Sequence, residues 1–228
     1  MVTVSPAKRR HPPFGRALAF LLLNLPLGIL SFVLITVLLS AGAGTLVVWV
    51  GVPLLAFLVL LTRGAGRMER ARVFALLDTY VDSPYLPLPP EGQRARWTTR
   101  LKDGATWRDL SYFFLLFPLG LAEFVLVVTF WATSLSLVAL PIYYRFLPEG
   151  AWFFPGYDVR WITVDSAVSA LPWAALGVLF AALSVALTRG LAALHGGLAV
   201  ALLRPTVSQR RRMERSWEQL DGMSAVTG

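Results

Sequence analysis

The chain has 228 residues, of which 56% are hydrophobic and 15% are charged, and its formal net charge is +8. Average globular chains are about 45–50% apolar and about 25% charged, so this composition is typical of a membrane protein and not of a soluble domain. The absence of cysteine excludes disulfide frameworks, thiol nucleophiles and thiolate metal sites.

The first long apolar stretch runs from Ala17 to Thr62 and contains no charged residue. As one helix it would be roughly 69 Å long, about twice the ~30 Å hydrocarbon core of a bilayer. It must therefore fold back on itself, and the small residues from Ser40 to Gly44 are the predicted place for the reversal. This gives two spans at about 17–39 and 45–62.

The basic residues are distributed unevenly along the chain. Of the 21 Lys and Arg residues, 19 lie in residues 1–16, in residues 63–109 or after Thr188, and only Arg145 and Arg160 lie elsewhere. The positive-inside rule produces this distribution when both termini of a four-span protein are cytoplasmic. We therefore attribute the surplus charge to topology and to anionic lipids, and we do not expect nucleic-acid binding.

Residues 63–109 are expected to connect the two membrane hairpins. Arg63 to Ala75 is predicted to be helical, either lying along the inner membrane surface or extending the second span. Tyr80 to Gly92 carries four prolines and is predicted to be an extended connector. The pattern from Thr106 to Asp109 resembles a capping box that begins the next helix.

The second hairpin is predicted to have spans at about 113–140 and 166–188. Residues 141–165 between them are rich in aromatic residues and proline and form the predicted outside loop. Residues 17–205 thus make a four-span membrane domain, with a basic cytoplasmic segment at 1–16 and a basic cytoplasmic tail at 206–228.

Two sequence matches indicate an internal repeat. Leu25 to Leu34 matches Phe117 to Leu126, sharing Pro-Leu-Gly, and Leu61 to Gly64 matches Leu187 to Gly190, sharing Leu-Thr-Arg-Gly. The predicted fold class is therefore an all-α membrane protein with four transmembrane helices in two tandem hairpin repeats. Each hairpin is followed by an amphipathic helix at the cytoplasmic face.

Several motifs together resemble a known family. The Leu-Thr-Arg-Gly motif precedes an Arg/Glu helix, the segment Arg100 to Leu110 (RLKDGATWRDL), Phe-Pro-Leu-Gly, and Leu140 to Tyr144 (LPIYY). This series is similar to the sensor domain of actinobacterial two-component histidine kinases. In that family the four-span unit precedes a dimerisation helix and an ATP-binding domain, and the resemblance implies detection of a stimulus at the membrane.

This sequence departs from the kinase pattern after Arg215, where no phosphoacceptor motif and no ATP-binding motif follow. His11 and His195 are the only histidines, and His195 lacks the acidic neighbour of a phosphoacceptor box. We expect either a separate sensor-like protein or the sensor part of a longer one. No motif indicates an enzyme, a cofactor or a metal site.

Glu123 is the most specific candidate residue, because a carboxylate inside a span is costly and is a functional candidate by default. A structural role, with Asn24, Ser31 or Ser134 as hydrogen-bond partner, is the alternative. The outside loop offers further candidates for ligand contact, for which interfacial anchoring is the alternative: Trp152, Tyr157, Arg160 and Trp161. Candidate hinges of a signalling bundle are Pro26, Pro118, Pro141 and Pro172.

The sequence thus favours a sensor-type protein of the plasma membrane that relays an envelope or membrane stimulus to a cytoplasmic partner such as a histidine kinase. Its expected partners are the lipid bilayer and this signalling protein. A homodimer is also considered, since Gly177 and Ala181 are spaced for close helix contact. A small transporter or lipid-handling protein, and a structural membrane subunit, are the alternative functions.

Overall fold

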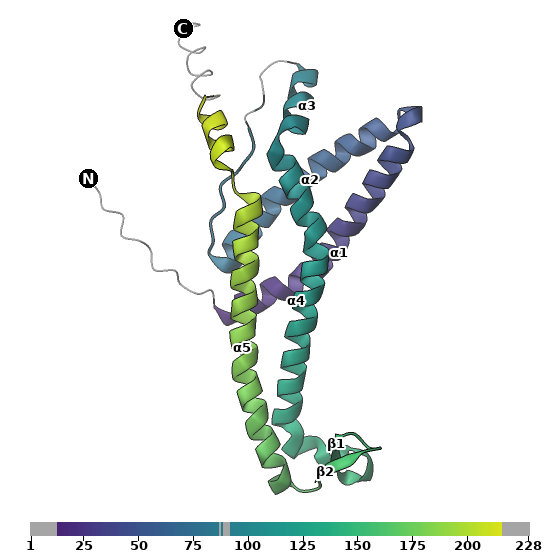
Figure 1. Cartoon of the computed structure of the whole chain (residues 1–228), viewed down its shortest axis with the longest axis vertical. Helices are drawn as coiled ribbons and strands as arrows, with labels where there is room; N and C mark the ends of the chain where they lie inside the picture. The colour runs from purple at the N-terminus through teal and green to yellow at the C-terminus, as the bar shows by residue number, and fades with distance from the viewer. Residues whose placement is uncertain (1–12, 87, 89–91, 216–228) are drawn as a thin grey trace, which may run out of the picture. The chain divides into compact units, whose positions relative to one another are not determined.

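Figure 1 shows a computed structural model of the chain that describes residues 13–86, 88 and 92–215. Most of the predicted basic segment at 1–16 and the end of the predicted tail, residues 216–228, lie outside the described residues. The chain divides into two compact units. Unit 1 comprises Met1–Leu121 and Ala192–Gly228, and unit 2 comprises Ala122–Leu191. Each unit is described by itself.

Within the part of the chain that the structure describes, four helices are long and apolar enough to cross a membrane, as predicted. They are α1 (Phe14–Gly44), α2 (Gly51–Leu77), α4 (Gly104–Tyr143) and α5 (Ala167–Leu203). Because about 20 residues suffice to cross the hydrocarbon core, α4 and α5 are each longer than one crossing requires. Both helices also belong to both units: α4 passes from unit 1 into unit 2, and α5 returns from unit 2 into unit 1.

The first reversal of the chain lies a few residues later than predicted. Helix α1 continues through Gly44, and the turn falls at Thr45–Val50, which includes a short 3₁₀ helix (Leu46–Val48) and Trp49 with φ of 64°. Gly42 and Gly51 allow the two helices to pack closely, because a Cβ added at Gly51 would collide with the Gly42 carbonyl oxygen. Small residues here allow close approach of two helices and do not break α1.

The segment between the two hairpins decides between the alternatives for residues 63–75. Residues 63–77 continue α2 without a break, so they extend the second apolar helix. Residues 78–92 have no regular structure where they are described, as the prolines predict. A short helix that was not predicted, α3 (Gln93–Lys102), then precedes α4.

The predicted capping box at Thr106 is wrong. Helix α4 begins at Gly104, and Asp103 is the residue before it. The Ala105 backbone N–H donates to Asp103 Oδ1 over 3.0 Å, which is the bond of an N-terminal cap. Thr106 lies one turn too late for that role, and its hydroxyl donates instead to the Arg100 carbonyl.

Helices α1 and α4 cross within unit 1 at the two Pro-Leu-Gly motifs. A Cβ added at Gly28 would lie 2.8 Å from the Leu116 carbonyl oxygen, and one at Gly120 would lie 2.8 Å from that of Asn24. The contact is reciprocal, because Gly28 and Gly120 are matched positions, and Asn24 and Leu116 each lie one residue before the matched segments. The repeat itself stays a prediction, but its matching motifs contact each other.

Unit 2 contains an element that an all-α prediction lacks. Strands β1 (Trp152–Pro155) and β2 (Arg160–Val164) form an antiparallel hairpin in the predicted outside loop, with Phe153 opposite Thr163. Aromatic and β-branched residues favour this conformation. The hairpin is anchored on the ends of α4 and α5, where Val164 packs with Leu140 and Ala170 and where Trp152 meets Trp173.

Candidate functional site

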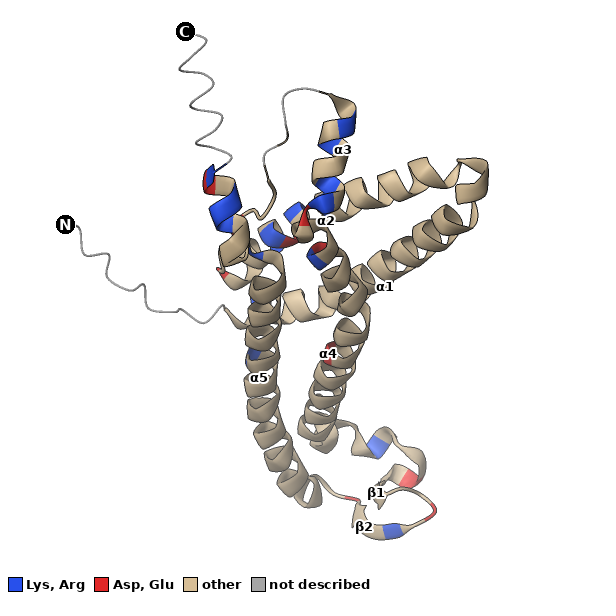
Figure 2. Cartoon of the chain, turned by 45° about the horizontal axis from the view of Figure 1, so that its top comes forward, with Lys and Arg blue, Asp and Glu red and all other residues tan. Residues whose placement is uncertain are grey.

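Charged residues in unit 1 are concentrated on α2, α3 and the first turns of α4, whereas most of α1 carries none (Figure 2). Several of these side chains are buried: Arg63, Glu69, Arg70, Asp103 and Asp109. Burial of a charge is costly unless it is paired and hydrogen-bonded. The pairing of these groups therefore defines how the helices of unit 1 can pack.

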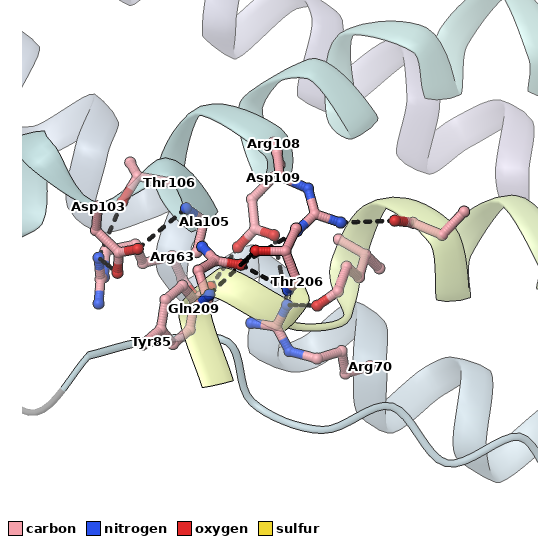
Figure 3. A network of polar contacts seen from close by, with 12 residues as sticks. Arg63, Arg70, Tyr85, Asp103, Ala105, Thr106, Arg108, Asp109, Thr206 and Gln209 are labelled. Carbon is pink, nitrogen blue, oxygen red and sulfur yellow. Dashed lines mark hydrogen bonds and ion pairs between the residues drawn. The ribbon is translucent and has the colours of Figure 1, made fainter. Parts of the chain in front are cut away.

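Arg63 joins α2 to the start of α4. Its Nη1 lies 3.1 Å from Asp103 Oδ2 and donates to Thr106 Oγ1 over 2.9 Å (Figure 3). Asp103 also accepts the capping bond from Ala105, so one carboxylate both begins α4 and neutralises a buried arginine. Asp103 thus couples the first residue of α4 to the buried Arg63 guanidinium on α2.

Arg70, two turns further along α2, makes the second ion pair. Its Nη1 lies 3.4 Å from Asp109 Oδ1 and equally far from the Leu203 carbonyl at the end of α5. The other terminal nitrogen, Nη2, is buried and has no hydrogen-bond partner among the described residues. Among the described residues, Asp109 is therefore the one carboxylate that compensates the charge of Arg70.

Tyr85 of the connector contacts both of these ion pairs (Figure 3). Its hydroxyl lies 3.0 Å from the Arg63 carbonyl oxygen and donates to Asp109 Oδ2, while the Arg63 guanidinium lies 4.0 Å from the ring centroid. Burial first, and then the negative charge of Asp109, raise the pKa of Tyr85 above its usual range. The phenol thus stays protonated and keeps its hydrogen bond.

Gly66 makes room for this arrangement. A Cβ at that position would collide with Asp109 Oδ2 and would lie 2.8 Å from the Tyr85 hydroxyl. We expect Gly66→Ala to displace Tyr85 and to speed amide hydrogen exchange in residues 79–86 by about ten- to a hundredfold, since bonds to charged groups contribute about 1.5–3 kcal/mol. Gly64→Ala, one half-turn away with nothing within 4 Å of the added Cβ, is the matched control. Equal exchange rates in the two variants would contradict this role of Gly66.

The raised pKa of Tyr85 also predicts how stability responds to alkali. A group whose pKa is higher in the folded protein stabilises it fully below its ordinary pKa, near 10, and loses that contribution as pH rises further. We expect the thermal midpoint of the wild type to fall more steeply than that of Tyr85→Phe between about pH 9.5 and 11.5. Tyr80→Phe alters an exposed tyrosine of the same connector and should leave the steep fall unchanged.

The carboxyl-terminal segment contacts the same end of α4. Arg108 donates to the Ala201 carbonyl over 2.6 Å and to Gln209 Oε1 over 3.2 Å. Gln209 Oε1 also accepts from the Thr206 backbone N–H, which begins the helical residues 207–215. The end of α5 and the following basic segment are thus bound to α4.

Next to these ion pairs, five side chains form a closed hydrogen-bonded ring, which we call the histidine ring. It consists of Asn24 of α1, Glu69 and Arg72 of α2, Tyr112 of α4 and His195 of α5. Arg72 Nη2 donates to Asn24 Oδ1 over 2.7 Å and to Glu69 Oε1 over 2.6 Å. The Tyr112 hydroxyl lies 2.7 Å from Glu69 Oε1 and 3.0 Å from His195 Nε2.

The ring closes between His195 and Asn24, whose Nδ1 and Nδ2 atoms are 3.2 Å apart. Phe20 of α1 covers the imidazole edge-on, with ring centroids 5.2 Å apart, and His195 is only 2% exposed. One ring of polar contacts therefore joins all four long helices within unit 1.

The predicted candidate residues lie elsewhere, in unit 2. Glu123 is buried in α4, with 8% of its surface exposed. The other four all lie on the β-hairpin or in its turn, where Trp152 packs on Trp173 and Trp161 is 75% exposed. Arg160 forms a two-bond ion pair with Glu149, and these hydrogen bonds raise the pKa of its guanidinium.

All four candidate hinge prolines lie inside helices. Pro26 is in α1, Pro118 and Pro141 are in α4, and Pro172 is in α5. Their role as hinges stays a prediction. Gly177, considered above for a dimer, packs within the chain, since an added Cβ would lie 2.6 Å from the Val138 backbone nitrogen.

No local pattern in the sequence predicts the histidine ring. The residues around His195 show only that it lacks the acidic neighbour of a phosphoacceptor box, and Glu69 and Arg72 belong to the predicted helical segment from Arg63 to Ala75, for which a surface helix and an extension of the second span were both open. A usable signal was present: His195 lies in a long apolar tract, Leu191 to Leu203, where an isolated polar side chain needs a partner.

A comparison with protein families agrees with the resemblance of the motifs. The family model described as "Putative sensor" matches residues 20–203, which include most of all four long helices, the β-hairpin and the buried ion pairs. No curated protein and no solved structure matches the chain. Because the family model covers well over half of the sequence, the chain belongs to this sensor family.

Proposed function

We propose that this protein is a sensor of the plasma membrane that relays a stimulus in the bilayer or at its outer face to a cytoplasmic partner. The observation that carries the proposal is the continuity of α4 and α5. The same two helices that hold the β-hairpin in unit 2 bring Asp109, Tyr112 and His195 to the charges of α2 in unit 1. A conformational change in unit 2 can therefore be transmitted to unit 1 along the continuous helices α4 and α5.

The charge distribution supports a cytoplasmic position for α3 and for both termini. Basic side chains on α3 and on residues 207–215 include several exposed groups: Arg94, Lys102, Arg210, Arg211 and Arg212. Such a surface suits anionic lipid headgroups or an acidic partner surface. A two-component histidine kinase is the partner class that the sequence resemblance implies, and a homodimer would place two such surfaces together.

Deletion of the gene, followed by transcript measurement under acid, detergent and cell-wall stress, tests the relay. We expect the deletion to abolish one transcriptional response, and we expect the wild-type gene to restore it. Asp82→Ala, which alters an exposed ion pair with Arg210, should also restore the response and serves as a control for expression. An unchanged transcript profile under every stress would contradict a sensing function.

Buried Glu123 is the observation that favours the alternative of a small transporter. Glu123→Gln distinguishes the two functions in the same strain. In a sensor it should abolish the response while the protein still binds its partner, whereas in a transporter it should abolish uptake of a solute. Retention of both activities would instead favour a structural subunit.

A further inference from the structure

Unit 1 contains a pocket beside α3 that takes no part in the buried ion pairs or in the histidine ring. Its volume is about 440 Å³, within the ~300–1,000 Å³ that small-molecule sites occupy. Leu86 of the connector lines it on one side and Arg212 of residues 207–215 on another. The third side is one face of α3, whose lining residues are spaced i, i+3, i+4 and i+7: Ala95, Thr98, Thr99 and Lys102.

Each wall of the pocket is held by the rest of unit 1. Leu86 directly follows Tyr85, whose hydroxyl donates to Asp109. Helix α3 is separated from α4 by a single residue. Arg212 lies about one turn beyond Gln209, which accepts a hydrogen bond from the start of α4. Because the walls are already positioned, a ligand would pay little of the ordering cost that weakens binding to a mobile surface.

The pocket is strongly basic. Helix α3 and residues 207–215 together carry eight basic residues and one acidic residue, Glu214 (Figure 2). The aspartates of the connector and of the start of α4 are paired with other arginines: Asp78 with Arg16, Asp82 with Arg210, Asp103 with Arg63 and Asp109 with Arg70. Lys102 and Arg212 form no ion pair with a described residue, so both cations remain available to an anion.

Two threonine hydroxyls add further hydrogen-bonding groups. Thr98 donates to the Arg94 carbonyl oxygen over 2.9 Å, and Thr99 donates to the Ala95 carbonyl oxygen over 3.0 Å. These oxygens also accept the backbone bonds of the helix. Each hydroxyl can therefore turn toward a ligand without leaving a helical bond unmade.

From this arrangement we propose that the pocket binds a phosphate ester with an apolar body. The phosphate lies between Lys102 and Arg212, and the apolar part lies against Leu86 and Ala95. A phosphate carries more than one negative charge and several acceptor oxygens in a tetrahedral array, which suits two cations and two hydroxyls better than a planar carboxylate does. A soluble phosphate ester and the headgroup of an anionic phospholipid share this chemistry.

A ligand in this position bridges α3 and residues 207–215. It therefore fixes the basic carboxyl-terminal segment relative to the helix that leads into α4. This inference goes beyond the proposed relay, because binding requires neither a signalling partner nor a stimulus. Binding can be present in a protein that relays nothing, and the relay can operate without this ligand.

Isothermal titration of hexyl phosphate into the full chain in phosphatidylcholine nanodiscs tests the site, with empty nanodiscs as the blank. We expect Lys102→Gln combined with Arg212→Gln to weaken binding by about ten- to a hundredfold, since both remove charge-assisted hydrogen bonds. Arg94→Gln combined with Arg211→Gln removes equal charge from exposed positions of the same two segments outside the pocket and should weaken binding by less than about threefold. Equal weakening in the two double variants, or no binding by the wild type, would overturn the proposal.

Two further titrations test the class of ligand. Heptanoate matches hexyl phosphate in length and should bind more weakly, because it carries one charge and two oxygens. In Leu86→Ala we expect hexyl phosphate to bind about three- to tenfold more weakly, since apolar contact is lost, and inorganic phosphate to bind as it does to the wild type. Heptanoate binding as tightly as hexyl phosphate, or an unchanged affinity of Leu86→Ala for hexyl phosphate, would contradict the assigned ligand class.

The lipid composition of the nanodisc distinguishes the two sources of the phosphate. If a phospholipid fills the pocket, phosphatidic acid in the nanodisc should compete with hexyl phosphate, whereas oleate at equal charge should compete less. If the ligand is soluble, neither lipid should compete, and the site stands in both cases. Equal competition by oleate and by phosphatidic acid would show that surface charge alone acts and would overturn the proposal.

Amide hydrogen exchange measures the bridge itself. Saturating hexyl phosphate should slow exchange in residues 94–102 and 207–215 by about threefold or more in the wild type and in the Arg94→Gln and Arg211→Gln control. The Lys102→Gln and Arg212→Gln variant should show no such slowing at the same concentration. All four substituted side chains are exposed, so both variants should fold, which circular dichroism checks. Unchanged exchange in the wild type with ligand bound would contradict a site between these two segments.

Discussion

Replacing Asp109 with alanine is expected to lower the free energy of unfolding by about 3–5 kcal/mol. The substitution removes the only carboxylate paired with Arg70, whose second terminal nitrogen already has no partner among the described residues. It also removes the acceptor of the Tyr85 hydroxyl and so releases the connector 78–92. Denaturant unfolding of purified protein in nanodiscs, followed by circular dichroism, measures the loss.

Two controls distinguish the cost of leaving the buried Arg70 charge unpaired from other destabilising effects of the substitution. Asp109→Ala combined with Arg70→Met removes both charges, and this double variant should be more stable than Asp109→Ala alone. Asp82→Ala breaks the exposed pair with Arg210 and should change stability by less than about 1 kcal/mol. If Asp109→Ala were as mild as Asp82→Ala, the ion pair on Arg70 would not stabilise unit 1.

Adding one methyl group at the crossing of α1 and α4 is expected to destabilise the protein by about 1–3 kcal/mol. In Gly28→Ala the new Cβ would lie 2.8 Å from the backbone of Leu116 and of Phe117, and in Gly120→Ala it would meet the backbone of Asn24. Backbone atoms cannot move aside as the end of a flexible side chain can, so the helices must separate. The same unfolding measurement in nanodiscs applies.

The sign of the stability change distinguishes a steric clash at the α1–α4 crossing from the effect of alanine's higher helix propensity. Alanine favours a helix over glycine by up to about 1 kcal/mol, so Gly44→Ala and Gly197→Ala, with nothing within 4 Å of the new Cβ, should be neutral or stabilising. The double variant Gly28→Ala and Gly120→Ala should cost less than the sum of the single variants, because both open the same contact. Neutral behaviour of Gly28→Ala would mean that α1 and α4 do not pack this closely.

The sequence predicted the helices well and their ends less well. Long uncharged tracts leave few alternatives to membrane helices, and the prolines of the connector exclude a helix there. The first turn was misplaced because Ser40 to Gly44 can remain helical where two helices pack closely. The cap at Asp103 was missed because a second cap-like residue, Thr106, follows it three positions later.

The buried contacts could not be predicted, because each of them joins residues far apart in the sequence. Arg63 lies on α2 and Asp103 just before α4, whereas Arg70 and Asp109, and Asn24 and His195, lie in different helices, and no local pattern pairs any of them. Glu69 and Arg72 are an ordinary surface pair by spacing, and only the approach of α1, α4 and α5 makes them internal. The β-hairpin was likewise concealed, since its aromatic residues are also typical of a membrane interface.

In the topology that we propose, the chain crosses the membrane four times and its basic segments lie on the cytoplasmic side. The cysteine-free chain allows a direct test with single cysteines at Gln93, which begins α3, and at Asp158, an exposed position between the strands of the hairpin. A membrane-impermeant thiol reagent applied to intact cells should label the cysteine at 158 and should label that at 93 only after lysis. Labelling of position 93 in intact cells, or protection of 158 there despite its reaction after lysis, would contradict the account.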